Sequence, residues 1–280
     1  MSRTVNITCR YYNVKAYKNN PTSTEKYNLL NWLNSINEMS LTNRTKTMGQ
    51  TRGRLDNITR RNNFYALNFI RMESYSSTYI VTDNENAKHV DISVENDEYI
   101  GKNTVAIYDS ENAIIMLMGN QGGFSAHTIT SYINSFFEQP VCVLDPIKTN
   151  KNFDNPDNKY GKISIKISNV HDYESTHGCA YEEALNKARD MGANTMSFEF
   201  SIGRKTRDYL DANMVKTIIS DAYSNMGAVS IARVKMQDEE GTAIYNLFEN
   251  VKNVVISLQA DFKGEIEYTV IAGAMIDAYK

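Results

Sequence analysis

The 280-residue sequence contains few cysteines, prolines and tryptophans, with three, four and one of them respectively. Cys9, Cys142 and Cys179 are odd in number and far apart, which excludes a framework of paired disulfides. No apolar run reaches the roughly 18 residues of a membrane-spanning helix, and the first residues lack the apolar stretch of a signal peptide. We therefore expect a cytoplasmic protein that is not inserted in a membrane.

Motifs that carry catalysis or hold a cofactor are also missing. The glycine-rich turn after Met118 has neither the Lys-Ser/Thr pair of a P-loop nor the glycine spacing of a dinucleotide site. No nucleophile elbow occurs. His171, His177 and Cys179 lack the second pair of ligands that a zinc site needs. The sequence thus predicts no catalytic residue, no metal and no cofactor, and it does not indicate an enzyme.

The overall composition is that of a globular protein, with 41% hydrophobic and 22% charged residues. Its formal net charge of −3 hides a separation of charge along the chain. Residues 1–61 hold 11 Lys or Arg and 3 acids, a net of +8, whereas residues 83–145 hold 2 Lys and 10 acids, a net of −8. A protein that is acidic as a whole can therefore present positive charge locally.

The densest positive stretch, residues 43–61, is called the basic segment below. Thr, Asn and Gln lie between its cations, and this mixture suits phosphate because guanidinium groups bind oxyanions in pairs of hydrogen bonds. Gly49 and Gly53 predict a mobile loop. The alternative is a solvated loop that offsets the acidic segment of the same fold. The six cations of the basic segment are Arg44, Lys46, Arg52, Arg54, Arg60 and Arg61.

A second basic pair, Arg233 and Lys235, lies on a predicted strand. Residues two apart share one face of a strand, so both side chains point the same way. We take this pair as a second candidate phosphate contact. The alternative is an ordinary solvent-facing edge.

The periodicity of apolar residues predicts helices and strands along the whole chain. Amphipathic helices are expected over residues 24–39 and after Ser125, with strand pairs joined by tight turns between them. Asp211 predicts the start of another helix. The tail from residue 265 is ambiguous between strand and helix. This mixture predicts an α+β fold of two lobes with largely antiparallel sheets.

A break in composition divides the chain. Residues 146–161 are polar and contain two of the four prolines, which predicts a linker. We expect an N-terminal α+β domain over residues 1–145, with a basic loop at residues 43–61, and a C-terminal α+β domain over residues 162–280.

The order of several segments resembles a family of phage-exclusion proteins. These segments are Asn103–Asp109 (NTVAIYD), Gly122–Ser125 (GGFS), the helix Thr128–Phe137 and Ile231–Gly241 (IARVKMQDEEG). The chain is similar in this order to the RexA-like abortive-infection family, and more faintly to KwaB of the Kiwa anti-phage system. The resemblance implies a homodimer that binds double-stranded DNA with little sequence preference and acts with a membrane-protein effector.

The leading hypothesis is a non-catalytic phage-defence component that binds DNA and signals to a partner. Two alternatives stay open. The first is a protein–protein interaction module of phage or host, in which the +8 and −8 segments pair between chains. The second is a metal-dependent nuclease or hydrolase whose site is assembled from scattered carboxylates and histidines.

Overall fold

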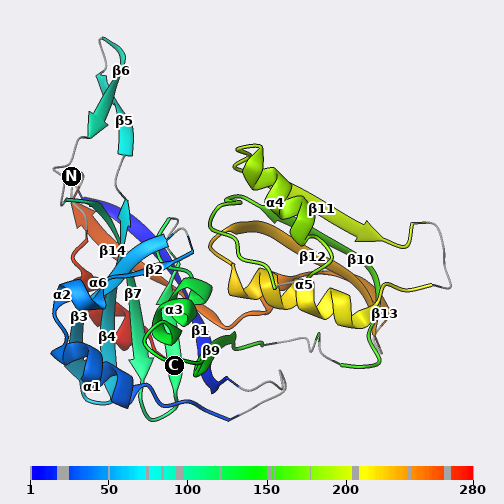
Figure 1. Ribbon diagram of the computed structural model, residues 1–280, viewed down its shortest axis with the longest axis horizontal. Helices are drawn as coiled ribbons and strands as arrows, with labels where there is room; N and C mark the ends of the chain where they lie inside the picture. Colours follow the sequence, from blue (N-terminus) through cyan, green and yellow to red (C-terminus); the bar gives the residue numbers. More distant parts are fainter. Residues whose placement is uncertain are drawn as a thin grey trace.

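Figure 1 shows the computed structural model of the chain, in which two sheets lie side by side and carry helices on their faces. The structure describes residues 2–17, 25–49, 51–73, 76–82, 85–92, 98–119, 122–149, 153, 155–176, 178–203, 208–238, 241–261 and 266–279.

The first and larger sheet is antiparallel throughout. Its strands follow the order β14-β1-β8-β7-β4-β3-β2, and β9 also pairs with β1. The bounds are β1 (Ser2–Ala16), β2 (Lys46–Met48), β3 (Thr51–Arg61), β4 (Phe64–Glu73), β7 (Ile100–Asp109), β8 (Ile114–Met118), β9 (Cys142–Pro146) and β14 (Asn253–Asp261). The hairpin of β5 (Ser76–Thr82) and β6 (Glu85–Ile92) forms a separate two-stranded sheet.

Both faces of the first sheet are buried, because successive side chains of its central strands enter different cores. Tyr12 packs in one core and its neighbour Tyr11 in the other. The helices α1 (Leu30–Glu38), α2 (Leu41–Arg44) and α3 (Ala126–Asn134) lie on the first face, where Trp32 and Tyr132 meet edge to face. The helix α6 (Tyr268–Ala278) covers the second face against β7, β14 and β4.

The second sheet has the order β11-β10-β12-β13, and the described helices cover one of its faces. Its buried face continues the first core through Ile163, Ile165 and Val234, on which α5 packs. The bounds are β10 (Lys159–Ile167), α4 (Glu182–Asp190), β11 (Met196–Ser201), α5 (Ala212–Ser224), β12 (Val229–Asp238), β13 (Gly241–Asn246) and the short 3-10 helix η1 (Leu247–Asn250).

The predicted α+β class and the antiparallel pairing are confirmed. Two predicted helix starts are also confirmed, since Ser125 accepts a hydrogen bond from the Thr128 amide and Asp211 accepts one from the Met214 amide. The ambiguous tail is a helix from Tyr268 onward.

The basic segment is not a loop but part of the first sheet. It runs through α2, β2 and β3. Its two glycines, Gly49 and Gly53, have different structural roles. Gly49 turns the chain between β2 and β3 with a φ of +55°. Gly53 lies inside β3, where a Cβ would meet the Ile70 carbonyl oxygen at 2.5 Å and the Phe124 ring at 2.7 Å. Close packing, and not flexibility, requires that glycine.

The expected C-terminal domain, residues 162–280, does not fold as one body. Its last two elements return to the first lobe, where β14 pairs with β1 from Ser2↔Asp261 to Arg10↔Asn253 and α6 covers the sheet. The reason is that β1 needs a partner on its open side and the tail offers a strand with alternating apolar residues. The second lobe is therefore an insertion between β9 and β14.

We predict that Gly53→Ala lowers the free energy of unfolding by about 1–3 kcal/mol, because the added methyl group has no room between Ile70 and Phe124. Gly273→Ala is the matched control. Apart from its two chain neighbours and the backbone of its own helix, no described atom lies within 4 Å of its Cβ position. Alanine also favours the α6 helix, so this variant should be neutral or stabilising. Urea unfolding of both variants measures the difference, and equal stabilities would contradict the packing argument.

Candidate functional site

No described helix or strand covers the face of the second sheet that lies away from α5. Strand alternation places Ile163 and Ile165 inside and sends Lys162, Ser164 and Lys166 outward from β10. The same alternation on β12 sends out Ile231, Arg233 and Lys235. We call this surface the basic sheet face, formed by Lys162, Ser164, Lys166, Ser197, Glu199, Ile231, Arg233, Lys235 and Ile244.

The register between strands brings these cations together. Lys162 lies directly opposite Lys235, Ser164 opposite Arg233, and Lys166 opposite Ile231. Two lysines in one cross-strand pair repel each other and weaken the sheet. An anion bound between them would relieve that repulsion.

The local charge of the basic sheet face is strongly positive. Among the described residues, its single acid is Glu199, which pairs with Lys162 at 2.8 Å and accepts a hydrogen bond from Ser164 at 2.9 Å. Lys162 and Ser164 hold the pKa of Glu199 below its usual range. Within the described part of the chain, Lys166, Arg233 and Lys235 form no ion pair, so three positive charges remain unbalanced.

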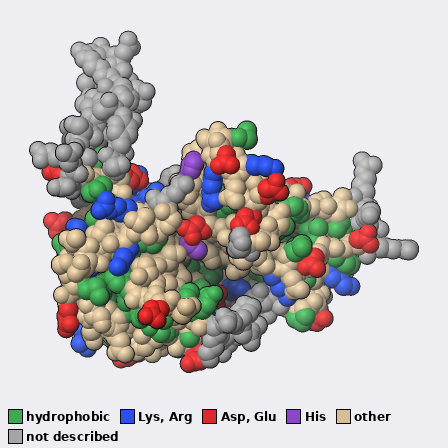
Figure 2. Space-filling model, in the orientation of Figure 1, with side chains coloured by type: hydrophobic (Ala, Val, Ile, Leu, Met, Phe, Trp, Pro, Cys, Tyr) green, Lys and Arg blue, Asp and Glu red, His purple; other side chains and the backbone are tan. Residues whose placement is uncertain are grey.

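The basic sheet face is hollowed and partly apolar. Its side chains line a depression of about 460 Å³. Ile231 and Ile244 stand in this depression with 37% and 67% of their surface exposed. The opposite side of the lobe, seen in Figure 2, carries acidic and basic side chains interspersed over α4 and α5. The unbalanced cations are thus a property of the open face and not of the whole lobe.

The structure uses two of the six cations of the basic segment to hold the fold. Arg44 is only 8% exposed and donates to the carbonyl oxygens of Met39, Asn37 and Asp56. Arg54 is paired with Asp56 at 2.7 Å. Both side chains hold the fold around α2 and β3.

The other four cations of the segment lie against neighbours. The Lys46 ammonium is 4.6 Å from the centre of the Phe136 ring, and the Arg52 guanidinium lies 4.7 Å from that of Tyr99. Arg60 covers Tyr65, and Arg61 reaches Asp277 of α6 at 3.4 Å. The cations of the basic segment therefore lie apart along one edge of the first sheet. Arg233 and Lys235, in contrast, share one sheet face with Lys162 and Lys166.

Lys162 and Lys166 were missed by the sequence analysis, although a signal existed. The stretch Lys162–Lys166 reads basic, apolar, Ser, apolar, basic, which is the alternation that identified Arg233 and Lys235. What the sequence lacks is the pairing of β10 with β12, because these strands are separated by two helices and β11.

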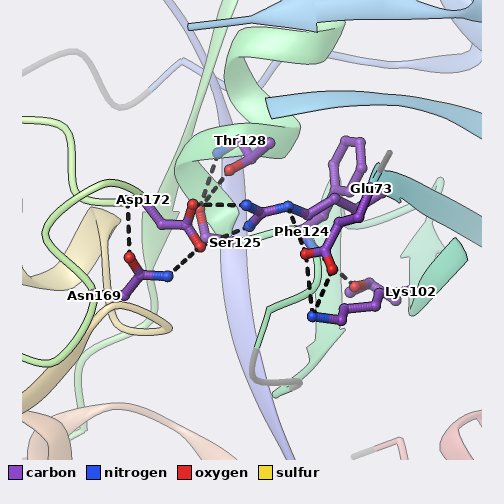
Figure 3. Close-up of polar contacts among 9 residues, drawn as sticks. Glu73, Lys102, Phe124, Ser125, Thr128, Asn169 and Asp172 are labelled. Carbon is purple, nitrogen blue, oxygen red and sulfur yellow. Dashed lines mark hydrogen bonds and ion pairs between the residues drawn. The ribbon is translucent and has the colours of Figure 1, made fainter. Parts of the chain in front are cut away.

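A polar junction fixes the second lobe to the first sheet. Arg71 of β4 donates two hydrogen bonds, at 2.6 and 2.9 Å, to the carboxylate of Asp172, which follows β10. Figure 3 shows Asn169 on one side of that carboxylate and the Glu73–Lys102 pair beyond it. The Asp172 carboxylate raises the pKa of Arg71 above its usual range.

A second group at the junction contains histidine, serine and carboxylates. His127 Nε2 contacts Glu174 Oε2 and, at 3.2 Å, Ser131 Oγ. A catalytic Ser–His–acid relay uses both ring nitrogens, one for each partner, so this arrangement differs from it. Asp221 is buried and accepts hydrogen bonds from Thr176 and Tyr181, an arrangement that holds the loop before α4. Burial raises the pKa of Asp221.

The remaining sequence candidates can be located in part. His171 and Cys179 lie in the loop between β10 and α4, and His177 lies outside the described residues. In the described part of the chain, no three His, Cys, Asp or Glu side chains are grouped closely enough to hold a metal ion. Among the described helices, none combines the length and the apolar character needed to cross a membrane.

Comparison with models of protein families gives a match over almost the whole chain. The model of a family of unknown function, DUF6731, matches residues 2–280. The chain belongs to this family. No curated protein and no solved structure matches it. DUF6731 covers both lobes, so the insertion of the second lobe and its basic sheet face lie within the matched region.

We predict that Arg71→Met lowers the free energy of unfolding by about 1.5–3 kcal/mol, because the Asp172 side chain, 18% exposed, loses its charged partner. Arg71→Lys keeps the charge but loses the two-pronged contact, so its effect should be intermediate. Denaturant unfolding measures both. A loss no larger than that of Lys187→Met, which breaks the exposed pair with Glu183, would contradict this role.

The junction should also respond to pH through Glu174. The hydrogen bond with His127 lowers the pKa of Glu174 below 4.5. Because the pKa is lower in the folded than in the unfolded protein, the stabilisation is present at about pH 6 and is lost as the pH falls below about 4.5. Glu174→Gln should therefore lower stability by less than about 1 kcal/mol at pH 6, since the side chain is 44% exposed. If the difference in stability between Glu174→Gln and the parent protein grew on acidification, this role of Glu174 would be disproved.

Proposed function

We propose that this protein binds the phosphate backbone of nucleic acid through the basic sheet face, with little sequence preference. The observation that carries the proposal is the cluster of Lys166, Arg233 and Lys235, which stand on one open sheet face and form no ion pair with any described residue. Anions of the density found along a nucleic acid are the ligands that such a cluster attracts.

The residue types on this face favour phosphate. Arginine donates parallel hydrogen bonds to an oxyanion, lysine acts as a point charge, and serine hydroxyls add neutral donors. Ser164 lies between Lys162 and Lys166 on β10, and Ser197 lies opposite Lys166 on β11. Contacts of this kind fix the position of the backbone and do not distinguish bases.

The basic segment becomes the secondary candidate. Arg44 and Arg54 are engaged within the fold, whereas Arg52, Arg60 and Arg61 are exposed side chains that can still meet phosphate. The proposal therefore places the main contact on the second lobe and any auxiliary contact on the edge of the first sheet.

The cellular role is proposed from the resemblance described above. A cytoplasmic protein with this activity fits a component of phage exclusion that detects DNA and signals to a membrane-protein partner. Assembly as a homodimer belongs to the same proposal. The basic sheet face supports its DNA-binding part, and the partner and the trigger rest on the resemblance.

The test is a fluorescence anisotropy titration of the full chain with mixed-sequence 20-mer DNA, single-stranded and duplex, at several salt concentrations. We expect dissociation constants on the order of 1–100 μM near physiological salt. Three neutralised phosphates give a slope of log K against log salt of about −2 to −3. Absence of binding to both forms at low salt would refute the proposal.

Variants locate the contact. Arg233→Gln with Lys235→Gln removes two of the three unbalanced charges, so the slope should fall to about −1. Arg52→Gln with Arg60→Gln removes the same charge from the basic segment and should change the slope less. For single changes, Lys166→Gln is matched by Lys187→Gln on α4, the exposed partner of Glu183. Equal effects of the two single variants would mean that net charge, and not the basic sheet face, governs binding.

A further inference from the structure

The proposed site contains two side chains that a phosphate contact does not require. Ile244 is 67% exposed and lies directly opposite Lys235, while Ile231 is 37% exposed and lies directly opposite Lys166. Each isoleucine thus adjoins a lysine in a cross-strand pair. Branched apolar side chains left in water beside cations point to a ligand with apolar surface close to its negative charge.

A nucleic-acid duplex does not present such surface. Its base faces are stacked inside, and proteins reach only the phosphates and the base edges in the grooves. The major groove admits a helix or a two-stranded ribbon, but the basic sheet face belongs to a four-stranded sheet with helices behind it. A duplex lying across this face would contact its lysines and leave both isoleucines in water.

An unpaired strand satisfies both kinds of side chain. Its bases are free to turn toward the protein, and they contribute apolar contacts that do not depend on sequence. The strand geometry fits a short piece of backbone: residues two apart on one strand, such as Arg233 and Lys235, are about 7 Å apart, and neighbouring strands are about 4.8 Å apart. The depression of about 460 Å³ between the cations gives the bases a place to enter.

We infer that the basic sheet face prefers single-stranded nucleic acid over duplex, with phosphates on Lys166, Arg233 and Lys235 and bases against Ile231 and Ile244. This inference rests on the proposed function and names the ligand class of the same site. Ser164 lies opposite Arg233 and Ser197 lies opposite Lys166, so each hydroxyl adjoins one of the phosphate contacts.

The test compares the 20-mer as a single strand and as a duplex at one salt concentration. We expect about tenfold tighter binding of the single strand. Ile231→Ser with Ile244→Ser should weaken single-strand binding by about three- to tenfold, leave its salt slope unchanged and leave duplex binding unchanged. Val255→Ser on β14 is the control, since Val255 is also an exposed aliphatic side chain, 56% accessible, on the other sheet.

The outcomes separate the inference from the proposed function. Duplex binding as tight as single-strand binding, or equal loss of both in the isoleucine variant, overturns the inference and keeps the function. If the parent protein binds neither the single strand nor the duplex at low salt, the inference and the proposed function are both overturned. Binding of poly-glutamate in preference to either nucleic acid assigns the face to an acidic protein partner and also overturns the inference. An RNA strand of the same sequence, run beside the DNA strand, shows whether the sugar matters.

Discussion

Strand β1 is the element on which the rest of the structure depends. It pairs with β14 over its first half and with β8 and then β9 toward its end, so the amino-terminal strand holds elements from the middle and the end of the chain. Its side chains enter both cores in turn, with Cys9 and Tyr11 on the α6 side and Tyr12 and Val14 on the other. A slip of one residue would exchange the two cores, so the register of β1 is strongly specified.

This constraint also determines where the second lobe stands. The chain leaves the first sheet at β9 and returns at β14, and both strands are partners of β1. The lobe between them is therefore anchored at two points on one strand, and the Arg71–Asp172 contact adds a third anchor on β4. One face of the second sheet packs into the same hydrophobic core as the first sheet. The lobe therefore exposes the opposite face of its sheet. The location of the basic sheet face thus follows from the way the lobe is attached.

Local pattern was enough to predict the class of fold and several element ends, because these depend on residues close in sequence. Ser125 and Asp211 cap helices through the amides three residues on. The pairing of β14 with β1 could not be predicted in this way, since it joins residues some 250 positions apart. Gly53 was misread for the same reason: its neighbours Ile70 and Phe124 are distant in sequence.

The candidate site shows the same division between local and distant information. Arg233 and Lys235 could be found because two residues on one strand share a face, whereas Lys162 joins them through the pairing of β10 with β12. The basic segment looked stronger because its charges are adjacent in sequence, but adjacency also gives them partners. Arg44 caps carbonyl groups around it and Arg54 meets Asp56 two residues away. The sequence shows how many cations lie close together along the chain. The register between strands determines which of them remain available to bind a phosphate.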